Sequence, residues 1–109
     1  MRIILASSSK TRKALLERLY GNEFEIFPPE IDETPLSQED PMMLSERLSL
    51  EKALKIARSN RDAVVIGSDQ VAFCDGRFLG KSTATEEAVN QIKWQIGKET
   101  KFFTGIALV

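Results

Sequence analysis

Three cations, Lys10, Arg12 and Lys13, follow the serine run Ser7–Ser9 close to the start of the chain. Apolar spacing in the following residues predicts a helix, so these cations would lie in its first turn, where the helix dipole disfavours positive charge. A bound anion would reverse that cost, and serine hydroxyls with backbone N–H groups are typical donors to phosphate. The glycines of a P-loop are absent. The segment therefore indicates either a phosphate site or a basic, solvated helix start with a serine cap.

Carboxylates form a second candidate group. Asp69 comes just after the apolar run 63–66, and Asp32 and Glu33 lie in an acidic stretch, residues 30–41, that could face it. Magnesium and similar cations bind carboxylate oxygens together with water and substrate phosphates. Asp69 could instead activate a water as a general base, or do both in turn. The alternative is that Asp69 caps a turn and that Asp32 and Glu33 form a solvated corner.

Lysines at positions 52 and 81 add further positive charge. Most lysines face solvent, but together with Arg12 these two would surround a phosphate chain and stabilise charge during phosphoryl or nucleotidyl transfer. The chain has no histidine, which excludes Ser-His-Asp and Cys-His nucleophiles and histidine-containing zinc sites. Any chemistry must therefore use carboxylates, amines, guanidinium groups and hydroxyls.

Composition places these residues in one small domain, residues 1–109. The formal net charge is −1, from 15 basic and 16 acidic side chains, which argues against broad nucleic-acid binding. A single cysteine, Cys74, forms no internal disulfide and fits a reducing compartment. No apolar run approaches the roughly 20 residues of a membrane span. We therefore expect a cytoplasmic protein with no membrane partner.

Hydrophobic patterning predicts an alternation of strands and helices, which is typical of an α/β domain. Leu15, Leu16 and Leu19 share one face of the first helix, and Val89, Ile92 and Ile96 share one face of the last. Ligands of such folds gather beyond the carboxyl ends of central strands, which here selects residues 7–13 and 67–70. The predicted elements are a strand at 3–6, a helix ending near Gly21, a strand at 24–27, a helix at 41–58, a strand at 63–66, a hairpin at 71–79, a helix opened by the capping box Thr83–Glu86 and ended at Gly97, and a strand at 101–109.

Several ordered motifs along the whole chain resemble the Maf family of nucleoside triphosphate pyrophosphatases, and within it the 7-methyl-GTP pyrophosphatase subgroup. The similar segments are Ile4–Ser9 with Arg12 and Leu15–Leu16, Ile31–Pro35, Leu50–Ala53, Val65–Val71, Asp75–Gly76, Gly80–Lys81 and Phe103–Gly105. The resemblance implies a Maf-like (inosine-triphosphatase-like) mixed sheet flanked by helices. It also implies hydrolysis between the α- and β-phosphates of 7-methyl-GTP or a related modified nucleotide, giving the monophosphate and pyrophosphate.

The resemblance implies roles for individual residues of this chain. Asp69 would be the proton acceptor that activates water, and with Glu33 it would hold a divalent metal cation, Mg or Mn. Thr11 and Gln70 would contribute to base specificity. The phosphate-binding residues would be Ser8, Arg12, Lys13, Lys52 and Lys81.

Departures from the family pattern fall mainly around the first helix. Lys10–Lys13 replaces Pro-x-Arg-Arg, so Arg12 is kept while Lys13 loses the planar fork of arginine. Thr11 replaces a bulky specificity residue, and Ser82 replaces the proline that follows Lys81. A preference for 7-methyl-GTP therefore rests on Gln70.

Length is the larger departure, because family chains continue for roughly as long again after the strand that holds Gly105. We expect an N-terminal lobe only, with a half-built cleft and an apolar face that drives formation of a homo-oligomer, such as a dimer. The alternative to an active pyrophosphatase is a catalytically deficient, truncated nucleotide-binding or oligomerisation module.

Overall fold

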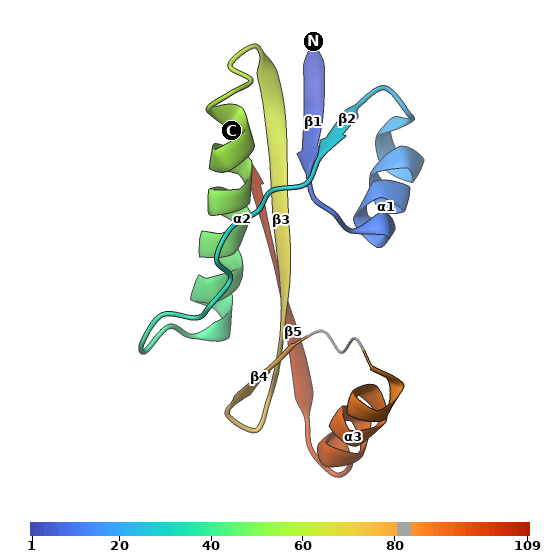
Figure 1. The fold of residues 1–109 in the computed structure, drawn as a ribbon, viewed down its shortest axis with the longest axis vertical. Helices are drawn as coiled ribbons and strands as arrows, with labels where there is room; N and C mark the ends of the chain where they lie inside the picture. Colours follow the sequence, from blue (N-terminus) through green and yellow to red (C-terminus); the bar gives the residue numbers. More distant parts are fainter. Residues whose placement is uncertain (81–83) are drawn as a thin grey trace.

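The computed structural model describes residues 1–80 and 84–109, and shows an α/β arrangement of five strands and three helices (Figure 1). The elements are β1 Arg2–Ala6, α1 Lys10–Tyr20, β2 Glu25–Phe27, α2 Pro41–Ala57, β3 Ala63–Cys74, β4 Arg77–Leu79, α3 Thr85–Gln95 and β5 Thr100–Leu108. None of the helices in this described part of the chain is long and apolar enough to cross a membrane.

Strand β3 is the centre of a single mixed sheet. β1 runs parallel to its first half, from the pair Arg2–Ala63 to the pair Ala6–Gly67, and β2 continues the sheet outside β1. β4 and β5 both run antiparallel to β3. The expected mixed sheet flanked by helices is therefore confirmed.

The expectation that the third strand ends before Asp69 is wrong. β3 continues without interruption for 12 residues, through Gly67, Ser68 and Asp69. β5 explains this continuity, because its register with β3 runs unbroken from Ile66 to Cys74. The Ser68 hydroxyl also donates a hydrogen bond of 2.9 Å to a β5 carbonyl. Asp69 thus lies in the middle of a strand and caps no turn.

Helix α2 covers one face of this sheet and supplies most of the core. It begins at Pro41, as predicted, with Asp40 as its N-cap. Two buried clusters lie beneath it, one around Ile4, Ala6, Ala53 and Val65 and the other around Leu44, Leu48 and Val71. Helix and sheet thus form two layers that meet along α2, β3 and β5 (Figure 1).

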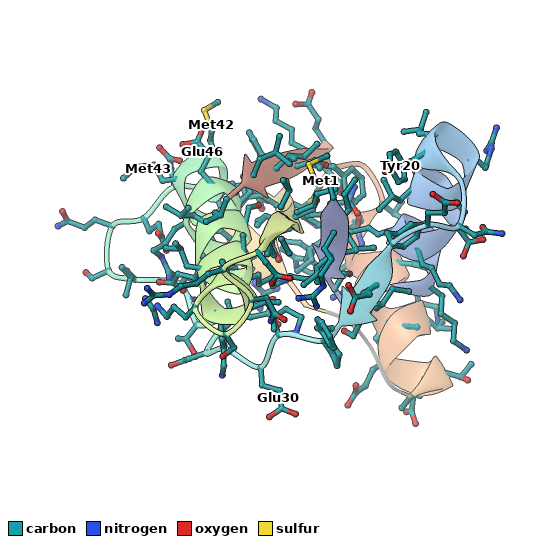
Figure 2. The ribbon with its side chains drawn as sticks, turned by 90° about the horizontal axis from the view of Figure 1, so that it is seen from above. Met1, Tyr20, Glu30, Met42, Met43 and Glu46 are labelled. Atoms are coloured by element: carbon teal, nitrogen blue, oxygen red, sulfur yellow. The ribbon has the colours of Figure 1, made fainter. Side chains whose placement is uncertain are left out.

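Helices α1 and α3 lie on the opposite side of the sheet from α2 (Figures 1 and 2). Neither helix has a buried residue. The helices predicted there are confirmed, but their apolar faces are not covered: Leu19 is 78% exposed and Ile96 is 73% exposed. The capping residue of the predicted box, Thr83, lies outside the described residues; α3 begins at Thr85 with Ala84 as its N-cap and no side-chain cap bond.

Candidate active site

Asp69 lies on the α2 face of β3. Side chains alternate between the faces of a strand, and Val71 on the same face packs against α2. A Cβ added to Gly67, also on this face, would meet the backbone of α2. The Asp69 side chain is only 7% exposed. Gln70 is exposed, and by the same alternation it belongs to the opposite face.

Lys52 of α2 joins two of the predicted carboxylates. Its Nζ donates a hydrogen bond of 2.8 Å to Asp69 Oδ1 and lies 3.2 Å from Glu33 Oε1. The Lys52 side chain is 10% exposed, so this lysine does not face solvent. The structure therefore brings Asp69, Glu33 and Lys52 together from a strand, a loop and a helix.

Close packing of α2 on the sheet allows Lys52 to reach Asp69. A Cβ on Gly67 would lie 2.1 Å from the carbonyl oxygen of Ser49, and a Cβ on Gly105 would lie 2.5 Å from that of Ser45. Gly105 is also the cross-strand partner of Asp69. The two glycines therefore let the helix backbone approach the strands on either side of the site.

Small residues on α2 complete this close approach, and the sequence analysis missed them. Ser45, Ser49 and Ala53 are buried and spaced four residues apart, so they lie on one face of the helix. The Ser49 hydroxyl is satisfied locally, because it donates a hydrogen bond of 2.6 Å to the Ser45 carbonyl. A spacing of small residues at i, i+4 and i+8 is the signal that could have identified this packing face.

Asp32 does not join Glu33 at the Lys52 cluster. Its carboxylate accepts hydrogen bonds from the backbone N–H of Thr34, at 2.9 Å, and from the Thr34 hydroxyl, at 2.6 Å. These bonds hold the pKa of Asp32 below its usual range. Asp32 therefore stabilises the bend of the loop, and Glu33 alone extends from that loop to Lys52.

Serines 7 and 9 fix the start of α1. The Ser7 hydroxyl accepts a hydrogen bond from the N–H of Ser9, and the Ser9 side chain is the N-cap, accepting from the N–H of Arg12. Ser8 is exposed. The serine cap foreseen for this segment is thus present, and it leaves the Ser8 hydroxyl at the surface.

The predicted cations of α1 follow a strand that ends close to Asp69. Among the described residues, they make no direct contact with Lys52, Asp69 or Glu33. β1 ends at Ala6, which pairs with Gly67 two residues before Asp69. Arg12 is half-buried and Thr11 is exposed. Lys13 pairs with Glu17 at 3.7 Å. The predicted site residue Lys81 lies outside the described residues.

An open stretch of the β3 edge adjoins these groups. β5 occupies one edge of β3 from Ile66 to Cys74, so β1 and β4 share the other edge. β1 ends opposite Gly67 and β4 ends opposite Ala72. Among the described residues, no strand pairs with Ser68–Val71 on that edge. A ligand here would contact Asp69 on one face and Gln70 on the other.

The carboxylates suit a hard divalent cation that is completed by other ligands. Within residues 1–80 and 84–109, no group of three or more Asp, Glu, Cys or His side chains is placed to enclose a metal. Asp69 and Glu33 nevertheless meet at one nitrogen. Magnesium commonly takes one or two carboxylates and fills its remaining positions with water and phosphate. Asp69 and Glu33 are therefore the carboxylates that could contribute to such an ion.

The buried carboxylate–lysine pair lies beside an open stretch of β3 and just beyond the carboxyl end of β1, which is where α/β domains commonly bind ligands. The family is given by comparison with known proteins. The family model described as "Maf-like protein" matches residues 2–109, and the chain belongs to the Maf family.

Three curated relatives of this chain bear one name. A protein of Idiomarina loihiensis named 7-methyl-GTP pyrophosphatase is 44% identical over 108 residues, covering 97% of this chain and 54% of the relative. Proteins of the same name from a Polaromonas species and from Nitrosococcus oceani are each 47% identical over 107 residues, covering 98% of this chain and 48% and 53% of the relatives. The chain thus spans about half the length of the curated relatives it matches.

Proposed function

We propose that this chain carries the nucleotide site of a metal-dependent nucleoside triphosphate pyrophosphatase. The substrate is 7-methyl-GTP or a related modified nucleotide, which is hydrolysed between the α- and β-phosphates to the monophosphate and pyrophosphate. The names of relatives at 44–47% identity support this substrate class. The observation that carries the proposal is the buried contact of Lys52 with Asp69, next to the open edge of β3.

Asp69 is the proposed proton acceptor. Its Oδ1 is held by Lys52, which leaves Oδ2 to accept a proton from water. The water oxygen then bonds to phosphorus as the bridging P–O bond breaks, and pyrophosphate leaves. A magnesium or manganese ion held by Asp69 and Glu33 would supply positive charge to the phosphates. Lys52 fixes the orientation of the carboxylate during proton transfer.

Phosphate binding and base selection are proposed for residues other than Asp69 and Glu33. Ser8, Arg12 and Lys13 lie at the start of α1, where backbone N–H groups and the helix dipole also favour anions. Lys52 and Lys81 add positive charge. Gln70, next to Asp69 on β3 but on the other face, is proposed to contact the base together with Thr11.

Hydrolysis by wild type and Asp69→Asn tests this function. Pyrophosphate release is measured with magnesium or manganese and a panel of triphosphates that includes 7-methyl-GTP. Loss of a general base lowers the rate by at least about a hundredfold. Asp75→Asn is the matched control, because Asp75 lies in the β3–β4 turn with a φ of 48° that asparagine also tolerates. No pyrophosphate above the Asp69→Asn level would contradict the proposal.

Calorimetry with the same triphosphates distinguishes an active pyrophosphatase from the alternative, a module that only binds nucleotide. A catalytically deficient nucleotide-binding module would bind a triphosphate saturably without releasing pyrophosphate. That outcome would support the proposed nucleotide site and contradict the proposed hydrolysis. An active enzyme is expected to show both binding and turnover.

We also propose that the chain forms a homodimer. Large apolar side chains of α1, α3 and β5 are exposed on the side of the sheet away from α2, among them Leu19, Ile92 and Phe102. Apolar exposure of this extent marks association surfaces.

The buried, unpaired thiol of Cys74 supports a cytoplasmic location, where thiols stay reduced.

A further inference from the structure

We propose that Arg47 of α2 is a positioning residue, which holds the acidic loop, residues 30–40, so that Glu33 meets Lys52. This inference rests on the proposed function, in which Glu33 helps to hold a divalent cation. Arg47 lies five residues before Lys52 on the same helix. Its own side chain contacts the loop and the helix, and it acts on the site through Glu33.

The guanidinium of Arg47 binds the loop at two points. Its Nε and Nη2 donate to the two carboxylate oxygens of Glu39, at 2.7 and 3.0 Å, in a bidentate pair. Nη2 also donates to the backbone carbonyl of Thr34, at 3.2 Å. The Glu39 side chain is only 6% exposed, so this pair is shielded from solvent. Bidentate pairs of this kind fix geometry as well as adding energy.

The bonds of Arg47 fall just after Glu33 in the loop. The peptide of Thr34 follows Glu33 directly, and its N–H is held by Asp32. Glu39, itself clamped by Arg47, accepts a hydrogen bond of 3.0 Å from the N–H of Leu36. The segment from Asp32 to Leu36 is therefore tied at consecutive points, and Glu33 has its backbone fixed within reach of Lys52.

Lys55 holds the start of the same loop. Its Nζ donates to the backbone carbonyl of Glu30, while the Glu30 side chain points outward (Figure 2). Arg47 and Lys55 thus bind main-chain carbonyls of the loop from positions on α2 before and after Lys52. The register of the loop along the helix is set by these two cations.

If Arg47 only stabilised α2, its pair with Glu51 would be explained but its bonds to the loop would not. Nη1 of Arg47 donates to both carboxylate oxygens of Glu51, at 3.1 Å, which is an i, i+4 pair on the helix and is worth a few tenths of a kcal/mol in general. The bonds to Glu39 and to Thr34 reach outside the helix. A lysine could not make all of them, because it lacks the planar fork.

Amide hydrogen exchange tests the position of the loop without any ligand. Arg47→Met is compared with Arg58→Met, which removes an exposed arginine from the other end of α2. We expect the amides of Thr34 and Leu36 to exchange about tenfold faster in Arg47→Met, because charge-assisted hydrogen bonds are lost. Arg47→Lys should restore part of the protection. Exchange equal to that of Arg58→Met, or a uniform rise along α2 and β3, would overturn the proposal.

Manganese binding tests whether Arg47 acts through Glu33. The dissociation constant of Mn²⁺ is measured for wild type, Arg47→Met, Glu33→Gln and the double variant. We expect Arg47→Met to weaken binding several-fold in wild type and to have no further effect in the Glu33→Gln background. An equal loss in both backgrounds contradicts action through Glu33. If wild type binds no Mn²⁺, the proposed metal role fails, and hydrogen exchange alone then decides whether Arg47 positions the loop.

Discussion

The buried pair of Lys52 and Asp69 fixes the orientation of the proposed proton acceptor. Removing both charges from water costs free energy that their attraction repays only in part. A buried pair is therefore weak evidence of stabilisation, and it is better explained by placement. Lys52 holds Asp69 Oδ1 at 2.8 Å and also contacts Glu33, so one lysine fixes two carboxylates.

Substituting Lys52 should show that the buried Asp69 carboxylate depends on this lysine. Lys52→Met leaves the Asp69 carboxylate buried without its partner, and we expect the free energy of unfolding to fall by about 3 kcal/mol in urea denaturation. Replacing both residues, as Lys52→Met with Asp69→Leu, should recover most of the loss. Lys101→Met is the control, because Lys101 is 65% exposed and pairs only with an exposed carboxylate. A similar loss for both lysines would show that burial of the pair is unimportant.

Helix α2 organises the site at the scale of elements. It supplies Lys52 and contacts the acidic loop through Arg47 and Lys55. It lies against β3 and β5 at two glycines whose Cβ positions are filled by its backbone. The distance from Lys52 to Asp69 is therefore set by the packing of α2 on the sheet.

Filling that contact should separate α2 from the sheet. Gly67→Ala would place a Cβ 2.1 Å from the Ser49 carbonyl oxygen, so we expect a loss of about 3 kcal/mol in the free energy of unfolding, as for other overpacked cores. Gly80→Ala is the control, since a Cβ there meets nothing within 4 Å. Equal stability of the two variants in urea would contradict the close approach of α2.

The stability of the folded state should depend on pH through Glu39 of the acidic loop. The Arg47 guanidinium, followed by the Leu36 N–H, lowers the pKa of this carboxyl below its usual 4.5. A lowered pKa stabilises the folded state above the unfolded value, and the benefit disappears as the pH falls through the folded value. Wild type should therefore exceed Glu39→Gln in urea midpoint at neutral pH, and the difference should shrink below pH 4.5. The subtraction removes the contributions of Glu25 and Asp62, whose pKa values are lowered in the same direction by Arg2. A difference that stays constant from neutral pH to pH 3 would contradict this assignment.

At the scale of the whole molecule, the two sides of the sheet are covered unequally. The α2 side holds the two buried clusters. On the opposite side α1 and α3 carry apolar residues that remain exposed. β5 adds Phe102, Ile106 and Leu108, which are all more than 60% exposed. A second copy of the chain is the proposed cover.

Light scattering coupled to gel filtration should give twice the monomer mass of 12.2 kDa at micromolar concentration. Phe102→Lys with Ile106→Lys should shift the protein to monomer, because charge on an edge strand opposes pairing and apolar contact. Leu36→Lys is the control, as Leu36 is 59% exposed on the acidic loop. A wild-type monomer, or dimers in all variants, would contradict an interface at β5.

Local patterns in the sequence identified most elements but misplaced one boundary. The apolar runs at 3–6 and 63–66 and the helix at 41–58 were predicted from neighbouring residues, and the structure confirms them. The strand end before Asp69 was wrong because pairing with β5, more than 30 residues away, keeps glycine and serine extended. Glycine there is a packing requirement of α2 and not a turn.

The sequence by itself determined the α/β class, the family motifs and the residue types available for chemistry without histidine. These follow from composition and short-range spacing. Only the tertiary structure decided that Lys52 is buried against Asp69, that Glu33 joins them while Asp32 does not, and that Arg47 holds the loop between them. The contacts of Lys52 with Asp69 and Glu33, and of Arg47 with Thr34, join residues 17, 19 and 13 positions apart in the chain. Their geometry depends on how α2 packs against the sheet and the loop, which none of the predicted elements specified.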